Sequence, residues 1–214
     1  MGTKTCMLVY SDGNAKEILK SQPKLDREIS IAVAKKLFPF KKFTLIEDGN
    51  LLFTNPPSSK LYVGSFPGMT IVSTDAIALD YPSRLPQSFI NTDLGNTMHL
   101  FAMHSVVDWF AYAIWKNGTL VRSLSVSGAD GEVLEHFGPK QPFEEFYWSE
   151  EHPLFNDPEE ENYSSFNFHP LELGDAALNE FLGYQIEGYS DSSHIDPEKI
   201  PLVGLQKLPW WKIW

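Results

Sequence analysis

The feature that most constrains this chain is an Asn117-Gly118 pair between two apolar runs, in the stretch AMHSVVDWFAYAIWKNGTLVRSLSV of residues 102–126. Asn-Gly is a preferred centre for a two-residue turn that joins antiparallel strands with the correct twist. Aromatic and β-branched residues, which favour strands, dominate both sides of the pair. We therefore expect a hairpin of two strands here.

Residues 105–115 also allow a helical interpretation. In a helix, Ser105 would be the N-cap and Asp108 the third helical residue, with the end at Gly118. Pairing across a two-residue turn favours the strand, because it sets apolar partners opposite one another. The expected pairs are Trp115 with Leu120, Ile114 with Val121, Ala111 with Leu124 and Trp109 with Val126.

Arg122 is the one charged residue inside the second strand of this hairpin. The expected register places it on a face shared with Trp109, Ala111, Ala113 and Trp115. A packed Arg needs a carboxylate partner, and Glu144 or Glu145 is a candidate, with Trp115 as a stacking surface. The alternative is an anion-binding Arg above a pocket whose floor the two alanines leave open.

His104, Ser105 and Asp108 look like the members of a catalytic triad in sequence. In a strand, successive side chains alternate faces, so His104 and Asp108 share one face and Ser105 points to the other. A local triad is thus excluded, and no Gly-x-Ser-x-Gly elbow supports a nucleophile. His104 and Asp108 remain candidates for an acid or a base, together with Arg122.

The remaining sequence alternates short strands with a few helices. We expect strands at 4–10 and 42–48, two or three strands within 60–80, and helices at 14–21, 25–39 and 170–185, with a loop and a short helix over 82–93. In the second helix Asp26 is the expected N-cap, and Ile29, Val33 and Leu37 share a face. This order predicts one α+β domain over 1–214, with a mainly antiparallel sheet.

Two segments do not fit this pattern. Residues 143–168 are rich in acidic and aromatic residues and contain no Lys or Arg, which is typical of a long loop held by its rings. The last residues, 208–214, read LPWWKIW. Their tryptophans, Trp210, Trp211 and Trp214, either cover the core or bind a partner.

Charge and cysteine content limit the possible functions. The net charge of -11 argues against binding to nucleic acid, which needs a basic surface. Residues 1–42 nevertheless hold nine Lys or Arg and four acids, a balance of +5, whereas the other residues balance to -16. A basic patch that meets an acidic partner is one interpretation, and a solvated helix face is the other. The single Cys6 lies in an apolar run and is expected to be buried and inert.

No signature of a metal or cofactor site is present. The six His show no HExxH motif, and His152 and His169 lie beside acids in what reads as a solvated loop, so we expect no metal. No glycine-rich phosphate loop occurs, so we expect no cofactor. No apolar segment approaches the roughly 20 residues that span a bilayer, and the N-terminus lacks the features of a signal peptide. We expect a cytoplasmic protein that does not bind membranes.

Several motifs resemble an uncharacterised bacterial family known only as a domain of unknown function. They are MGTKTCMLVYSDG, SFPGM, DYPSRLP, AMHSVVDWFAYAIW, LVRSLSVS, PFEEFYW with a following EHP, and HPLELGDAAL, in order over about residues 1–203. The resemblance implies no activity. The hairpin with its Lys-Asn-Gly turn and Leu-Val-Arg-Ser is also similar to one in small bacterial proteins of toxin-immunity type, which implies binding to another protein.

These observations lead to three functional hypotheses, of which a metal- or nucleotide-responsive domain that uses the acidic loop ranks last. The first is a non-enzymatic domain that binds another protein or a second copy, of bacterial defence, immunity or stress type. Its candidate binding residues are Trp109, Trp115, Arg122, Glu144, Trp210, Trp211 and Trp214. The second is a small hydrolase or transferase with a site near Arg122 or near His104 and Asp108.

Overall fold

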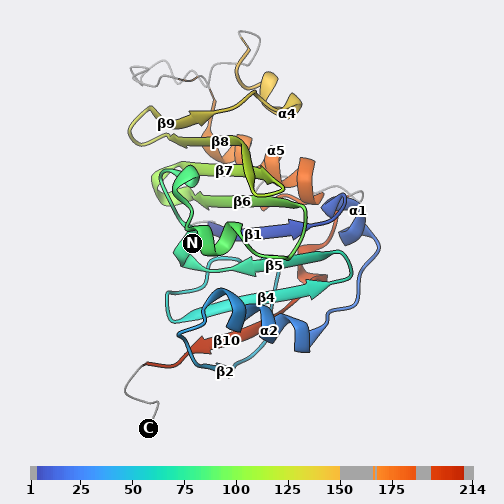
Figure 1. Ribbon diagram of the computed structural model, residues 1–214. Coiled ribbons are helices and arrows are strands. Elements are labelled where there is room, and N and C mark those ends of the chain that lie inside the picture. The colour runs from blue at the N-terminus through green and yellow to red at the C-terminus, as the bar shows by residue number, and fades with distance from the viewer. Residues whose placement is uncertain (1–3, 150–165, 167, 187–193, 210–214) are drawn as a thin grey trace.

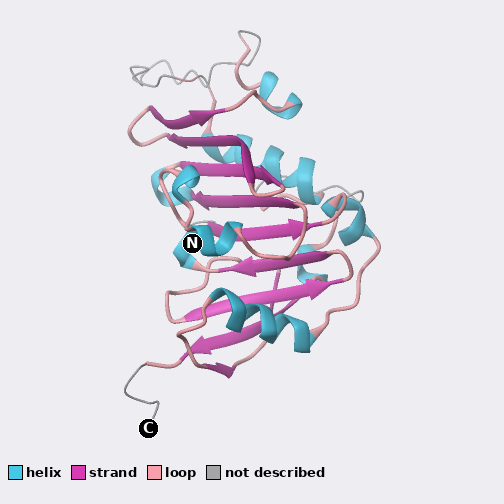
Figure 2. Ribbon diagram, in the orientation of Figure 1, coloured by secondary structure: helices cyan, strands magenta, loops and turns pink. Residues whose placement is uncertain are grey.

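The computed structural model describes residues 4–149, 166, 168–186 and 194–209, and it is built on one mainly antiparallel sheet (Figure 1). The ten strands run in the order β2-β10-β4-β5-β1-β6-β7-β8-β9, with β3 paired to β10. Helices lie on both faces of the sheet (Figure 2). The expected α+β class is therefore confirmed.

The described elements have the following bounds. The strands are β1 (Lys4–Ser11), β2 (Phe43–Leu45), β3 (Gly49–Asn50), β4 (Lys60–Phe66), β5 (Met69–Ser73), β6 (Thr97–His104), β7 (Trp109–Lys116), β8 (Thr119–Ser127), β9 (Glu132–Phe137) and β10 (Pro201–Lys207). The α-helices are α1 (Ala15–Lys20), α2 (Arg27–Leu37), α3 (Gln87–Ile90), α4 (Pro142–Glu145) and α5 (Pro170–Leu182). Short 3₁₀ turns lie at Asp75–Ile77, Pro82–Arg84, Ser105–Val107 and Pro197–Lys199.

Strand β1 lies at the centre of the sheet, between β5 and β6, and it is buried on both faces. Its side chains Met7 and Val9 pack toward α5, whereas Cys6, Leu8 and Tyr10 pack toward α2. A strand that is covered on both faces reads as a continuous apolar run and not as an alternating one. This explains why CMLVY is the most apolar strand segment near the N-terminus.

The face covered by α5 and α1 carries the larger core. His169 is the N-cap of α5, Pro170 occupies its first turn, and Gly183 ends it in the left-handed conformation at φ 78°. The inward side of α5 buries Leu178 and Leu182, and each fully buried leucine contributes about 1.5–3 kcal/mol. This packing fixes α5 across β6 and β7.

The opposite face is covered by α2 and by the short turns near β7 and β8. Asp26 caps α2 as expected, since its carboxylate accepts a hydrogen bond from the amide of Ile29 at 2.9 Å. Val33 and Leu37 are buried, whereas Ile29, which was expected on the same face of the helix, is 53% exposed. Ser30 takes that place, and its hydroxyl accepts a hydrogen bond from the amide of Ser65 on β4.

Two expected irregular segments are seen only in part. The acidic segment begins with the short helix α4, and Phe143, Tyr147, Trp148, Phe166 and Phe168 pack against the α5 core. Residues 150–165 and 210–214, including Trp210, Trp211 and Trp214, lie outside the described residues. Among the residues that are described, no helix is long and apolar enough to cross a membrane.

Candidate functional site

The hairpin β7–β8 turns at Asn117 and Gly118, which have φ of 49° and 75°, as expected for an Asn-Gly turn. Its register is shifted, however, by a β-bulge. Trp115 pairs with Leu120 as expected, but Ile114 then pairs with Arg122, so Val121 is an extra residue without a partner on β7. The expected pairs of Ile114, Ala111 and Trp109 were therefore wrong, and their observed partners are Arg122, Ser125 and Ser127.

The bulge moves Arg122 to the other face of the sheet. Ala111, Ala113 and Trp115 pack on the α2 side, whereas Tyr112 and Leu124 pack on the α5 side, where Arg122 also lies. The proposed anion site above the two alanines is thus wrong, and so is stacking on Trp115. The ring beside Arg122 is Tyr112, whose centroid lies 5.9 Å from the guanidinium carbon.

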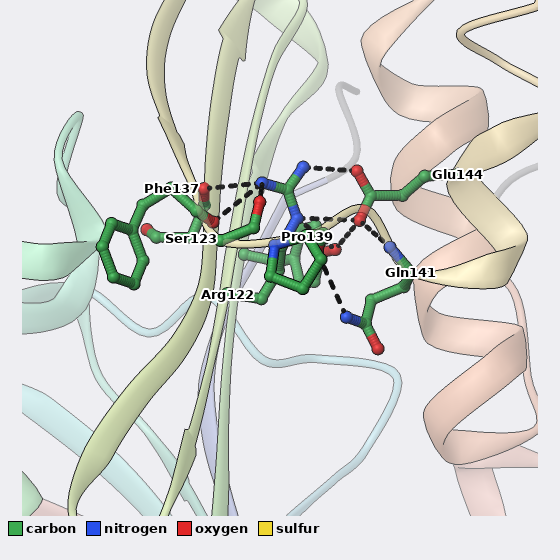
Figure 3. A network of polar contacts seen from close by, with 8 residues as sticks. Arg122, Ser123, Phe137, Pro139, Gln141 and Glu144 are labelled. Carbon is green, nitrogen blue, oxygen red and sulfur yellow. Dashed lines mark hydrogen bonds and ion pairs between the residues drawn. The ribbon is translucent and has the colours of Figure 1, made fainter.

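Arg122 is fully buried and forms an ion pair with the fully buried Glu144 of α4 (Figure 3). Arg122 Nε donates to Glu144 Oε1 at 2.9 Å, and Arg122 Nη2 donates to Glu144 Oε2. The contact is bidentate, which is the strongest geometry between a guanidinium and a carboxylate. Glu144 is one of the two carboxylates expected from the sequence, and Glu145 is exposed.

The third guanidinium nitrogen, Arg122 Nη1, forms hydrogen bonds with the backbone at the end of β9. Arg122 Nη1 donates to the carbonyls of Phe137 at 2.9 Å and of Gly138 at 3.3 Å, and to that of Ser123 at 3.3 Å (Figure 3). Gly138 has φ 76°, and a Cβ there would lie 2.1 Å from the carbonyl oxygen of Val121. Only glycine therefore lets β9 end this close to the bulge.

The carboxylate of Glu144 accepts further hydrogen bonds besides those from Arg122. Its Oε1 also accepts from the backbone amide of Gln141 at 2.8 Å and from the hydroxyl of Tyr112. Burial alone would lower the pKa of Arg122, but the hydrogen bonds and charge of Glu144 outweigh it and raise this pKa. Burial, followed by the charge of Glu144, raises the pKa of the Tyr112 phenol. Each guanidinium nitrogen of Arg122 and each carboxylate oxygen of Glu144 thus has a hydrogen-bond partner, and the network joins β7, β8, β9 and α4.

Ser105 and Asp108 lie in the turn between β6 and β7, and His104 is the last residue of β6. Residues Ser105–Val107 form a 3₁₀ turn and Asp108 is left-handed at φ 44°, so the strand alternation expected across this segment was wrong. His104 Nδ1 accepts a hydrogen bond from the amide of Val106 at 3.2 Å. The buried Ser105 hydroxyl has no hydrogen-bond partner within the described part of the chain.

Asp108 pairs instead with His169, the N-cap of α5. The two side chains lie 3.4 Å apart between Asp108 Oδ1 and His169 Nε2, and His169 Nδ1 accepts from the amide of Leu171. The Nδ1 atom of His169 therefore caps α5, while its Nε2 faces Asp108. This contact joins the β6–β7 turn to α5.

The hairpin tryptophans contact other parts of the fold. Trp115 is buried on the α2 face, and the half-buried Trp109 donates from Nε1 to Ser125 Oγ at 3.1 Å. Cys6 is buried as expected, and its burial, followed by the charge of Asp75, raises the thiol pKa to about 12. No cluster of three or more His, Cys, Asp or Glu suited to a metal occurs among the described residues.

A surface that the sequence indicated only by its charge lies where α2 leads into β2. We call it the basic corner and define it by Lys35, Lys36, Phe40, Lys41 and Lys42. All four lysines are exposed, and no ion pair within residues that the structure describes involves them. Phe40 is 94% exposed.

A shallow pocket of about 430 Å³ opens at the basic corner. Lys35, Lys41 and Lys42 line it together with Pro39, Phe43 and Leu208. Burial lowers the pKa of the nearby Lys207, and the charge of Lys41 lowers it further against the opposing effect of Asp75. The lysines here are close enough to one another to concentrate positive charge beside an apolar hollow.

Comparison with known proteins gives one match. A family model described as a family of unknown function, DUF6928, matches residues 5–205, which confirms the resemblance over 1–203 inferred from the motifs. No curated protein and no solved structure matches the chain significantly. The matched range runs from β1 to β10, and it includes Arg122, Glu144 and the basic corner.

Proposed function

The chain belongs to this family of unknown function, DUF6928, and we propose from its structure that it is a non-enzymatic protein-binding domain whose partner docks at the basic corner. The observation that carries the proposal is Phe40, an aromatic side chain that is 94% exposed among four lysines that form no ion pair with any described residue. Aromatic anchors surrounded by charged residues are typical of protein interfaces.

The expected partner presents an acidic segment with an apolar side chain. Carboxylates of such a segment would meet Lys35, Lys41 and Lys42, while its apolar side chain would enter the hollow beside Phe43 and Leu208. A protein segment fits better than a membrane or a nucleic acid. Those partners extend far beyond the corner, and the balance of -16 over residues 43–214 would repel them.

The enzymatic alternative has less support. Arg122 uses all three nitrogens on protein acceptors, and four pockets lined by described residues contain none of Arg122, His104 and Asp108. An immunity- or stress-type role, which the hairpin resemblance favours, is one form of the binding proposal. The identity of a captured partner would distinguish it.

Photo-crosslinking from the corner tests the proposal. The full chain carrying p-benzoylphenylalanine at position 40 should form an adduct with one protein in its native cell extract, because Phe40 would lie inside the interface. The matched control carries the same group at position 29, where Ile29 is also exposed but lies near the start of α2. A self-adduct at position 40 alone would identify the partner as a second copy.

Charge reversal supplies the second control. Lys41→Glu/Lys42→Glu should abolish the adduct at position 40, whereas Lys24→Glu/Lys116→Glu, at exposed sites away from the corner, should leave it unchanged. The adduct should also weaken between 0.05 and 0.5 M salt, roughly as expected for a screened exposed interface. Equal adducts at both positions, no adduct, or preferred binding to DNA or anionic vesicles would refute the proposal.

A further inference from the structure

A second, larger pocket opens where strands β1 and β4 begin. Its volume is about 670 Å³, and the residues that decide its chemistry are Lys4, Phe53, Asn55, Lys60, Tyr62 and Val106. It shares no lining residue with the pocket at the basic corner. Its size falls within the usual range for sites that hold small organic ligands.

The pocket lies beside the start of β1, where the first three residues of the strand have no paired residue on β5. The last β5 residue paired with β1 is Ser73, opposite Met7, and the loop that follows β3 takes the place of the missing strand. Cys6 donates its amide to the carbonyl of Thr54 at 2.6 Å, and the hydroxyls of Thr5 and Thr54 are hydrogen-bonded. This wall is therefore held by the central strand and is formed in advance of any ligand.

The mouth of the pocket exposes large apolar side chains. Phe53 is 63% exposed and Val106 is 69% exposed. Val106 lies in the turn after β6, close to His104, which pairs with Lys4 of β1. Leu52, Tyr62 and Ile186 extend the apolar lining inward. Single exposed apolar side chains are common on protein surfaces, but a contiguous cluster of them around a pocket is typical of a binding site.

Among the described residues, the charged groups that line the pocket are both lysines. Lys4 and Lys60 line it, Asn55 and the phenol of Tyr62 add polar groups, and no carboxylate of the described residues takes part. In the described part of the chain neither lysine forms an ion pair. Two lysines that no described carboxylate neutralises favour an anionic group from solution, even in a chain of net charge -11.

We propose that this pocket binds an amphipathic organic anion, with an apolar body along Phe53, Tyr62 and Val106 and an anionic head, such as a carboxylate, between Lys4 and Lys60. The apolar body supplies most of the affinity through burial. The lysines select the sign of the head group and its orientation. This activity is independent of the protein-binding role of the basic corner.

The test uses the full chain and a series of ten-carbon ligands with different head groups. Decanoate, decanol and decyltrimethylammonium share about the same apolar body but carry a negative, a neutral and a positive head. Isothermal titration should give one site for decanoate, weaker binding of decanol, and no binding of decyltrimethylammonium. Equal binding of the three ligands, or none of decanoate, would overturn the proposal without any variant.

Matched variants then assign the site. Lys4→Met/Lys60→Met keeps the apolar stems and removes the charges, so it should weaken decanoate about tenfold, as expected for two partly exposed ion pairs, and leave decanol unchanged. Lys35→Met/Lys42→Met, which removes the same charge at the basic corner, should leave both ligands unchanged. An equal loss of decanoate in both double variants would overturn the assignment to this pocket.

Discussion

Replacement of Glu144 by Gln should strongly destabilise the fold, because it leaves the charge of Arg122 buried and unpaired. The substitution is nearly isosteric, but it removes the negative acceptor of four donors, which are Arg122 Nε, Arg122 Nη2, the Tyr112 hydroxyl and the Gln141 amide. Breaking a buried ion pair from one side costs about 3–5 kcal/mol. Relaxation and water entry keep the cost below the sum of four separate hydrogen bonds.

Urea denaturation followed by tryptophan fluorescence measures this cost. With a slope of about 2–3 kcal/mol per M, the expected loss lowers the urea midpoint of Glu144→Gln by roughly 1.5 M. The matched control is Asp48→Asn, which breaks the Arg27–Asp48 pair, whose side chains are 49% and 36% exposed. That pair contributes at most about 1 kcal/mol, and salt should reduce its contribution.

A double-mutant cycle completes the test. Arg122→Met/Glu144→Leu replaces both charges by apolar groups. Its loss of stability should be several kcal/mol smaller than the summed losses of Arg122→Met alone and Glu144→Leu alone. Additive losses would show that the two side chains act independently. A Glu144→Gln loss no larger than that of Asp48→Asn, or one that 0.5 M salt removes, would refute the reasoning that the pair is buried and coupled.

Three further outcomes follow from buried groups. Burial, followed by the charge of Lys116, lowers the pKa of His99 to about 4, so the unfolded chain takes up a proton first as pH falls. Stability should fall by about 3 kcal/mol between pH 6.5 and 4, and His99→Phe should flatten that part of a urea-midpoint profile. Gly138→Ala should lower stability by at least about 1 kcal/mol in the same assay, because of its φ of 76° and the contact with Val121. The Cys6 thiol, with its pKa raised to about 12, should react with a disulfide reagent at pH 8 only as fast as the chain unfolds, as mass spectrometry of the labelled protein would report.

Local signals in the sequence predicted most elements, because each carries its own physical cause. Asp26 before an apolar period predicted the start of α2, and Asn117-Gly118 predicted the turn between β7 and β8. Strand β10 was missed, because PLVGLQK is short and its pairing with β4 joins residues far apart in the sequence. The basic corner was indicated by lysine content alone, since nothing local shows that Phe40 points into solvent.

The error about Arg122 has a single physical cause. Strand side chains alternate with a period of two, so one extra residue transfers every later side chain to the opposite face. The bulge at Val121 does this, and it turns Arg122 from the alanine face toward Tyr112 and Glu144. At the bulge the Val121 carbonyl lies against Gly138, whose lack of a Cβ admits it, and Gly138 lies 17 positions further along the chain. Strand pairs that are assigned by counting residues from the turn cannot reveal that contact. The pairing with Glu144 was still predictable, because a buried guanidinium needs a carboxylate on whichever face it lies.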